Sequence, residues 1–162
     1  MRIKLEPNAR NAVLGLEESV RMVGLEESLI NLVDIRASQT NGCAYCLDMH
    51  TQDAIAMGEK EQRIFCLSAW HDSLFYTERE KLALELTEAV TRTSVSGLSD
   101  DLYDRVRTSF SEREFIGLIM AINTINCWNR LSISCGLTEG MYKRNVSNET
   151  NGRYGAFQDL SL

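Results

Sequence analysis

Two thiols and an imidazole lie close together in one short stretch of the chain. Cys43, Cys46 and His50 occupy positions i, i+3 and i+7, and on a helix these positions share one face. A dithiol that can close into a disulfide, with a base one turn beyond its second sulfur, is the minimum equipment for thiol redox chemistry. The spacing therefore predicts a redox-active dithiol.

The order of the three residues indicates separate roles. Cys46 lies four residues before His50, so His50 is placed to take the thiol proton and leave a nucleophilic thiolate. Attack of that thiolate on the O–O bond of a peroxide would give a sulfenic acid, and Cys43 could condense with it to a disulfide and release water. We therefore predict Cys46 as the attacking cysteine, Cys43 as the resolving cysteine and His50 as the base.

The residues before the dithiol favour its ionised form. Asn41 can cap a helix and Gly42 can turn the chain, which predicts Cys43 in the first turn of a helix. Unpaired backbone N–H groups and the positive end of the helix dipole stabilise an anion there. A thiolate is such an anion, so we expect a lowered thiol pKa in this pair.

A metal site and simple packing are the alternatives for these residues. A structural zinc site needs four ligands, usually with a second paired cluster downstream, and the sequence has none. The other thiols and imidazole are scattered through apolar segments predicted to be helical, which is typical of core residues. They are Cys66, His71, Cys127 and Cys135.

Composition limits the function classes. The chain has 162 residues, 44% of them hydrophobic, which is enough for one domain with a core of its own. The formal net charge of −6 leaves no basic patch for nucleic acid or an anionic membrane. No apolar run has the length of a signal peptide or a membrane span. The five cysteines are an odd number and are too sparse for a secreted disulfide scaffold. We expect a soluble cytoplasmic protein with mostly reduced thiols.

The chain is predicted to be all-α, a single-domain helical bundle of six to seven helices. Pro7 is the only proline, and no segment shows the alternation of a half-buried strand. Thr77 and Ser111 each precede a glutamate by three residues, which is the capping-box pattern of a helix start. The expected helices are Ala9–Val23, Glu26–Gln39, Cys43–Met57, Glu61–Trp70, Thr77–Thr93, Asp100–Ser109 and Ser111–Cys135.

The last expected helix and the residues after it raise separate expectations. Apolar residues cover most of that helix, so it should be central or lie in an interface. Its polar stripe, Asn123, Asn126 and Arg130, is more typical of a hydrogen-bonded buried face than of a site. We assign residues 1–136 to the helical domain and 137–162 to a polar C-terminal tail, which we expect to dock on a neighbouring subunit.

The residues around the dithiol resemble a known family. Residues 38–51, which contain the Cys-x-x-Cys-x-x-x-His element, are similar to the core of the AhpD-like alkylhydroperoxidases within the carboxymuconolactone decarboxylase family. Ala69-Trp70 followed by residues 75–80, and residues 125–130, are similar to later segments of its small single-domain members. The likeness covers most of residues 25 to 135, and the cysteine-histidine element is its most specific part.

The resemblance implies an all-α fold that assembles into homo-oligomers, trimers or hexamers. It also implies reduction of hydroperoxides without haem, flavin or metal, so no cofactor is expected. By motif position, Cys46 would be the peroxidatic cysteine, Cys43 the resolving cysteine and His50 the base. The expected partners are a hydroperoxide substrate and a dithiol electron-donor protein of thioredoxin-like or lipoyl type.

One departure from the family concerns its proton relay. The peroxidases of the family usually carry a glutamate twelve residues before the first cysteine, where this chain has Asn31. An amide cannot accept and return a proton at neutral pH. The relay would then be His50 with water, or another carboxylate about one helical turn from Asn31, either Asp34 or Glu27.

The second departure is Tyr45, at a position between the cysteines where some relatives have histidine. Its phenol could hydrogen-bond a peroxide oxygen, but an aromatic wall of the pocket is the better interpretation. Trp70 is interpreted as core packing for the same reason.

Two other functions stay open at this point. One is the decarboxylation of a lactone acid after which the family is named, which has no evident need of a thiol pair. The other is a non-enzymatic, redox-sensing oligomer that keeps the dithiol without efficient turnover. Slow, stoichiometric oxidation without turnover would favour the second of these.

Overall fold

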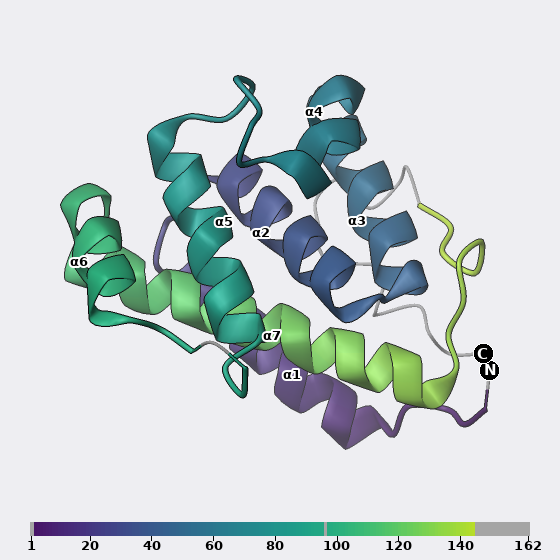
Figure 1. Ribbon diagram of the computed structural model, residues 1–162. Helices are drawn as coiled ribbons and strands as arrows, with labels where there is room; N and C mark the ends of the chain where they lie inside the picture. The colour runs from purple at the N-terminus through teal and green to yellow at the C-terminus, as the bar shows by residue number, and fades with distance from the viewer. Residues whose placement is uncertain (1, 96, 145–162) are drawn as a thin grey trace.

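The protein is an all-α bundle (Figure 1). The computed structural model describes residues 2–95 and 97–144, and no strand occurs among them. This confirms the predicted fold class. Within the described residues, seven α-helices and one 3₁₀ helix follow one another: α1 Pro7–Arg21, α2 Glu27–Asn41, α3 Ala44–Ala56, α4 Glu61–Cys66, η1 Leu67–Ala69, α5 Glu78–Thr91, α6 Asp100–Ser109 and α7 Glu112–Cys135.

The two predicted capping boxes are both formed. Thr77 caps α5 and Ser111 caps α7, and in each case the glutamate three residues later bonds back to the backbone N–H of the cap. These reciprocal bonds satisfy N–H groups that the first helical turn leaves without a partner. The start of each helix is therefore set locally.

The segment from Glu61 to Trp70 differs from its prediction as one α-helix. The α-helical part ends at Cys66, and residues 67–69 form the 3₁₀ turn η1. This tighter turn brings Trp70 inward, where its indole N–H donates to Glu88 Oε1 at 2.7 Å. Trp70 is 3% exposed, so its interpretation as a core residue is confirmed.

Helix α7 is central, as its apolar composition predicts. It packs against α1, α2, α3, α5 and α6 (Figure 1). Of its polar stripe, Asn126 is buried and its amide donates to Thr91 and to a backbone carbonyl within α7. Asn123 and Arg130 are exposed. The prediction of a buried, hydrogen-bonded face is therefore right for Asn126 and wrong for the other two.

One core cluster joins α2, α5, α6 and α7 at the end of the bundle away from the dithiol. Apolar side chains from these four helices fill it together with Val20 of α1 and Leu25 before α2. Several of its members are at most 2% exposed, so the cluster supplies much of the hydrophobic stabilisation. They include Val33, Leu86, Val106, Phe110, Leu118 and Ile122.

Alanine substitutions at two helical glycines are predicted to change stability in opposite directions. A Cβ at Gly117 in α7 would lie 2.5 Å from Cγ1 of Val23, whose β-branched side chain cannot easily turn away. Gly117→Ala should therefore lower the free energy of unfolding by about 1–3 kcal/mol. Gly15 in α1 has nothing within 4 Å of such a Cβ, so Gly15→Ala should raise it by about 0.5–1 kcal/mol.

Urea denaturation of both variants beside the wild type measures these changes. If both variants shifted the unfolding midpoint equally and in the same direction, the close packing of Gly117 in α7 against Val23 after α1 would be contradicted.

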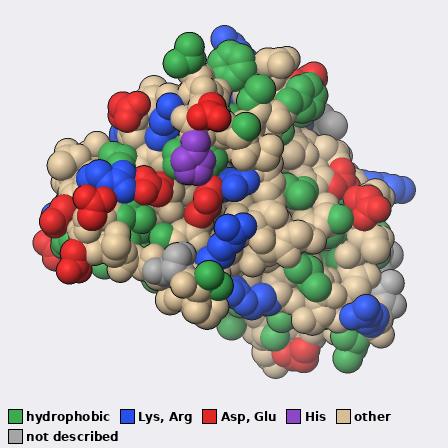
Figure 2. Space-filling view, viewed as in Figure 1, with side chains coloured by type: hydrophobic (Ala, Val, Ile, Leu, Met, Phe, Trp, Pro, Cys, Tyr) green, Lys and Arg blue, Asp and Glu red, His purple; other side chains and the backbone are tan. Residues whose placement is uncertain are grey.

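The surface carries both signs of charge. On the face in Figure 2, acidic and basic side chains are interspersed with exposed apolar ones. Among the described residues, no helix is both long enough and apolar enough to cross a membrane.

Candidate functional site

The dithiol lies at the junction of α2 and α3. Gly42 ends α2 in the left-handed conformation, with φ of 68°, which glycine adopts without a steric penalty. Its N–H bonds back to α2, and the N–H of Cys43 donates to the carbonyl of Ser38 at 3.0 Å. This turn delivers Cys43 directly to the start of α3.

Cys43 is itself the cap of α3, which corrects the prediction for this junction. The helix begins at Ala44, and Sγ of Cys43 accepts from the N–H of Cys46 at 3.4 Å. Asn41, the predicted cap, is instead the last residue of α2, and its amide donates to Asn126 at 2.8 Å. Because α2 continues to Asn41, its side chain contacts α7 and does not cap α3.

Cys43 and Cys46 are joined by a disulfide, with their Cα atoms 5.4 Å apart. They are 1% and 0% exposed. The pair belongs to a second apolar cluster, which also contains Met49 of α3 and Ile125 and Trp128 of α7. The two sulfur atoms are therefore bonded to one another and shielded from bulk water.

His50 lies one helical turn after Cys46, on the side of α3 that packs against α2. Its Nδ1 is 3.8 Å from Oδ2 of Asp34, and both side chains are fully buried. This separation exceeds a direct hydrogen bond, but two charges at such a distance in a buried site interact strongly. The Asp34 carboxylate can stabilise the positive charge that His50 gains when it takes a proton.

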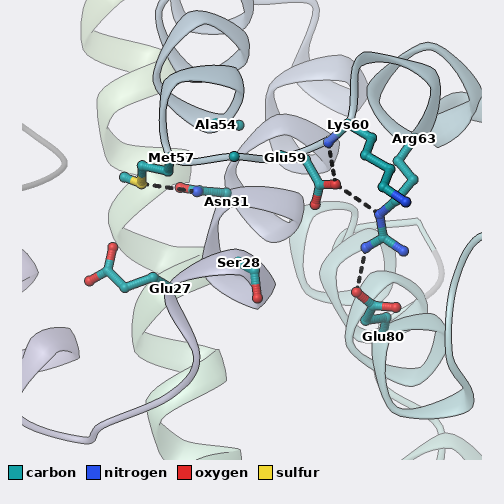
Figure 3. Close-up of a pocket in the computed structure, with 10 residues that line it drawn as sticks. Glu27, Ser28, Asn31, Ala54, Met57, Glu59, Lys60, Arg63 and Glu80 are labelled. Carbon is teal, nitrogen blue, oxygen red and sulfur yellow. Dashed lines mark hydrogen bonds and ion pairs between the residues drawn. The ribbon is translucent and has the colours of Figure 1, made fainter.

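Asn31, at the position of the missing relay glutamate and about one helical turn before Asp34, lines a pocket. The pocket has a volume of about 540 Å³ (Figure 3). The amide of Asn31 donates to Sδ of Met57 at 3.4 Å, and Asn31 is 2% exposed. Glu27, the other relay candidate, is exposed and lies at the edge of the same pocket. Of the two carboxylates, Asp34 is the buried one, and it lies 3.8 Å from Nδ1 of His50.

The guanidinium of Arg63 on the far wall of the pocket is already paired. It contacts Glu59 at 2.9 Å and Glu80 at 2.5 Å, as Figure 3 shows. Glu80 is also the capping glutamate of α5. This wall is therefore held by its own ion pairs.

Tyr45 is buried in the apolar cluster of the dithiol. It is 1% exposed. Burial, together with the negative charges of Asp48 and Asp53, raises the pKa of Tyr45 to about 12. Its phenol is therefore neutral at physiological pH and cannot serve there as a base.

Of the other candidate thiols and imidazole, Cys127 packs against the apolar cluster of the dithiol, whereas Cys66, His71 and Cys135 do not belong to that cluster. Cys135 is buried, whereas Cys66 and Cys127 are partly exposed. His71 is exposed and stacks on Trp70 with ring centroids 3.5 Å apart, so its prediction as a core residue is wrong. Within residues 2–95 and 97–144, no three His, Cys, Asp or Glu side chains are grouped to hold a metal ion.

Two aspartates on α3 have roles that the sequence reasoning missed. Asp48 accepts a hydrogen bond from the N–H of Gly140, and Asp53 accepts one from the hydroxyl of Tyr142. The partners are 92 and 89 residues apart along the chain. No local pattern signals such contacts, although Tyr142 stands out as an apolar anchor in a polar tail.

The family model described as "Carboxymuconolactone decarboxylase family" matches residues 7–89 of the chain. The uncharacterized protein YdfG of Bacillus subtilis (strain 168) is 43% identical over 133 residues, which are 82% of this chain and 90% of YdfG. These two matches cover the dithiol, His50 and the helices that hold them.

Solved structures share the fold. One is ATU0492 of Agrobacterium tumefaciens, a protein of unknown function provisionally described as antioxidant defence protein AhpD. It superposes with a TM-score of 0.80 at 38% identity, and the match covers 84% of this chain and 93% of ATU0492. The debrominase Bmp8, solved in its apo form, has a TM-score of 0.69 at 18% identity, covering 93% of this chain and 75% of its own. The second likeness concerns the fold alone. The chain belongs to the carboxymuconolactone decarboxylase family and is AhpD-like.

Proposed function

We propose that the protein is a thiol-dependent peroxidase that reduces hydrogen peroxide or organic hydroperoxides. One observation carries the proposal: a disulfide-bonded Cys43–Cys46 pair lies one helical turn from His50, which faces the buried carboxylate of Asp34. The likeness to the Agrobacterium protein described as AhpD supports the same chemistry. A purely structural disulfide would need neither the base nor its carboxylate.

The reaction begins with reduced cysteines. His50 takes the proton of Cys46, and the thiolate attacks one peroxide oxygen, so that an S–O bond forms and the O–O bond breaks. The leaving alkoxide receives the proton from His50 and departs as an alcohol. Cys43 then attacks the sulfenic acid of Cys46, the disulfide forms and water leaves. Two thiols and one hydroperoxide thus give one disulfide, one alcohol and one water.

Asp34 acts through His50 as a positioning residue. Its Oδ2 lies on the Nδ1 side of the imidazole, which leaves Nε2 as the nitrogen that exchanges a proton with Cys46. A carboxylate on the opposite nitrogen holds a catalytic imidazole in one orientation and stabilises its protonated form. Asp34 would thereby supply what the relay glutamate supplies in other peroxidases of the family.

A comparison of two substrates tests the proposal. Peroxide consumption with dithiothreitol as reductant should be lost in the double variant Cys43→Ser/Cys46→Ser. Decarboxylation of a carboxymuconolactone by the wild type should be absent. If the double variant consumed peroxide as fast as the wild type, or if the lactone acid were decarboxylated by both proteins, the peroxidase proposal would be wrong.

Restoring the family's glutamate should bring little benefit. Because Asp34 already faces His50, we expect Asn31→Glu to change the rate of peroxide reduction by no more than about twofold. The added carboxylate would be buried one turn from Asp34, where like charges repel. Stopped-flow rates of both proteins measure the effect, with Asn31→Gln as a control that keeps the amide. A tenfold gain on Asn31→Glu would instead identify the missing glutamate as the limiting feature.

We also propose that the protein works as a homo-oligomer recycled by a dithiol donor protein. Exposed apolar side chains on α4 and the loop after η1, Phe65, Leu74 and Phe75, support a subunit contact, since an apolar surface of this kind favours association. Light scattering of the full chain measures the assembly. A monomeric mass at micromolar concentration would contradict it.

A further inference from the structure

The first residues of the C-terminal tail lie against α3. We call residues 137–144 the strap. It runs from the end of α7 alongside α3, in yellow in Figure 1. Leu137, Met141 and Tyr142 of the strap pack against the apolar cluster that contains Cys43 and Cys46. The strap is therefore part of the apolar cover packed against the cluster in which the two sulfur atoms are buried.

Polar contacts tie the strap to two carboxylates of α3. The N–H of Gly140 donates to Oδ2 of Asp48 at 2.8 Å, and the hydroxyl of Tyr142 donates to Oδ1 of Asp53 at 2.7 Å. Nε of Arg144 lies 3.6 Å from the same Asp53 oxygen. Burial and the Asp53 carboxylate raise the pKa of Tyr142 above its usual value, so its hydroxyl stays a donor at neutral pH.

These contacts differ from the rest of the cover. The cluster's members from α1, α2 and α7 belong to the packed bodies of those helices, and moving them would break helix packing. Besides the apolar contacts of Leu137, Met141 and Tyr142, the strap is joined to α3 by two hydrogen bonds and one ion pair, each of which contributes only modestly to stability. The strap lies outside the helices, so its displacement would leave helix packing intact.

The disulfide needs such a displacement to react with another protein. Its two sulfurs belong to side chains that are 1% and 0% exposed. Thiol–disulfide exchange requires the attacking thiolate to approach a sulfur directly, so access limits the rate. A donor protein that carries its dithiol on its own surface cannot make that approach while the cover is in place.

We propose that the strap gates the reduction of the Cys43–Cys46 disulfide by a dithiol, through its release from Asp48 and Asp53. This inference rests on the proposed function for the identity of the dithiol as electron donor. After release, one donor thiolate attacks a sulfur of the pair and forms a mixed disulfide, and the second donor thiol displaces it. The donor becomes a disulfide, Cys43 and Cys46 become thiols, and two electrons are transferred.

The experiment measures reduction alone, with no peroxide present. The oxidised full chain is mixed with dithiothreitol or with a reduced thioredoxin, and the free thiols at Cys43 and Cys46 are counted over time. Tyr142→Phe/Arg144→Gln removes the strap's hydroxyl and its cation, and should accelerate reduction by about fivefold or more, most strongly with thioredoxin. Lys143→Gln is the matched control, because it changes an exposed strap residue and keeps the contacts of its neighbours.

Hydrogen exchange at Gly140 reports whether the strap has been released, because its amide is bonded to Asp48. We expect faster exchange in the double variant together with faster reduction. Faster exchange with an unchanged reduction rate would overturn the gate. An unchanged exchange rate would overturn the role of these contacts. Because this experiment contains no peroxide, it does not depend on the peroxidase step. A failure of the peroxidase proposal would be seen in a separate experiment, in which the reduced protein does not react with hydroperoxide.

Discussion

Replacement of Cys46 by serine is expected to abolish peroxide reduction, whereas replacement of Cys43 should stop the reaction one step later. Cys46 is the thiolate that attacks the peroxide, and a serine hydroxyl is a far weaker nucleophile at neutral pH. Cys43→Ser keeps the attacking sulfur but cannot form the disulfide, so one equivalent of peroxide should be consumed and a sulfenic acid should remain. Mass spectrometry of the protein after one equivalent of hydroperoxide distinguishes the two outcomes.

Cys135→Ser is the control, since Cys135 is buried at the end of α7 and takes no part in the proposed reaction. It should keep the wild-type rate. If Cys43→Ser abolished the first step and Cys46→Ser retained it, the two roles would have to be exchanged.

Replacement of Asp34 by asparagine has the second largest expected effect. We expect the rate of the reaction between peroxide and reduced protein to fall by about 10- to 100-fold, because His50 loses the carboxylate that orients it and stabilises its protonated form. The pH dependence should change as well. The variant loses the charged group that lies 3.8 Å from Nδ1 of His50, so its pH profile should differ from that of the wild type.

Asp104→Asn, at an exposed position on α6, is the matched control and should leave both the rate and the profile unchanged. Circular dichroism of Asp34→Asn establishes that the variant is folded. A folded Asp34→Asn variant with the wild-type rate and pH profile would remove Asp34 from the mechanism.

Much of the fold follows from local sequence signals. The capping boxes at Thr77 and Ser111 and the apolar coverage of α7 depend on residues within a few turns of each other, which is why they were predictable. The same holds for the order of Cys43, Cys46 and His50 along one helix. Helix ends were less predictable, and the junction at Gly42 moved because the glycine stops α2 later than expected.

The contacts between helices could not be predicted with the same certainty. Helical spacing put both Asp34 and Glu27 one turn from Asn31, but the choice between them depends on how α2 packs against α3, which brings Asp34 to His50 and leaves Glu27 at the surface. The pairing of Tyr142 with Asp53 joins residues 89 positions apart. It arises from the path of the chain after α7, which no local propensity encodes.

Stopped-flow mixing of reduced protein with an organic hydroperoxide, followed by counting of free thiols, tests the peroxidase proposal most directly. We expect a fast loss of two thiols per chain, with peptide mapping that finds the new disulfide between Cys43 and Cys46. Persistence of both thiols at excess hydroperoxide would contradict the proposal.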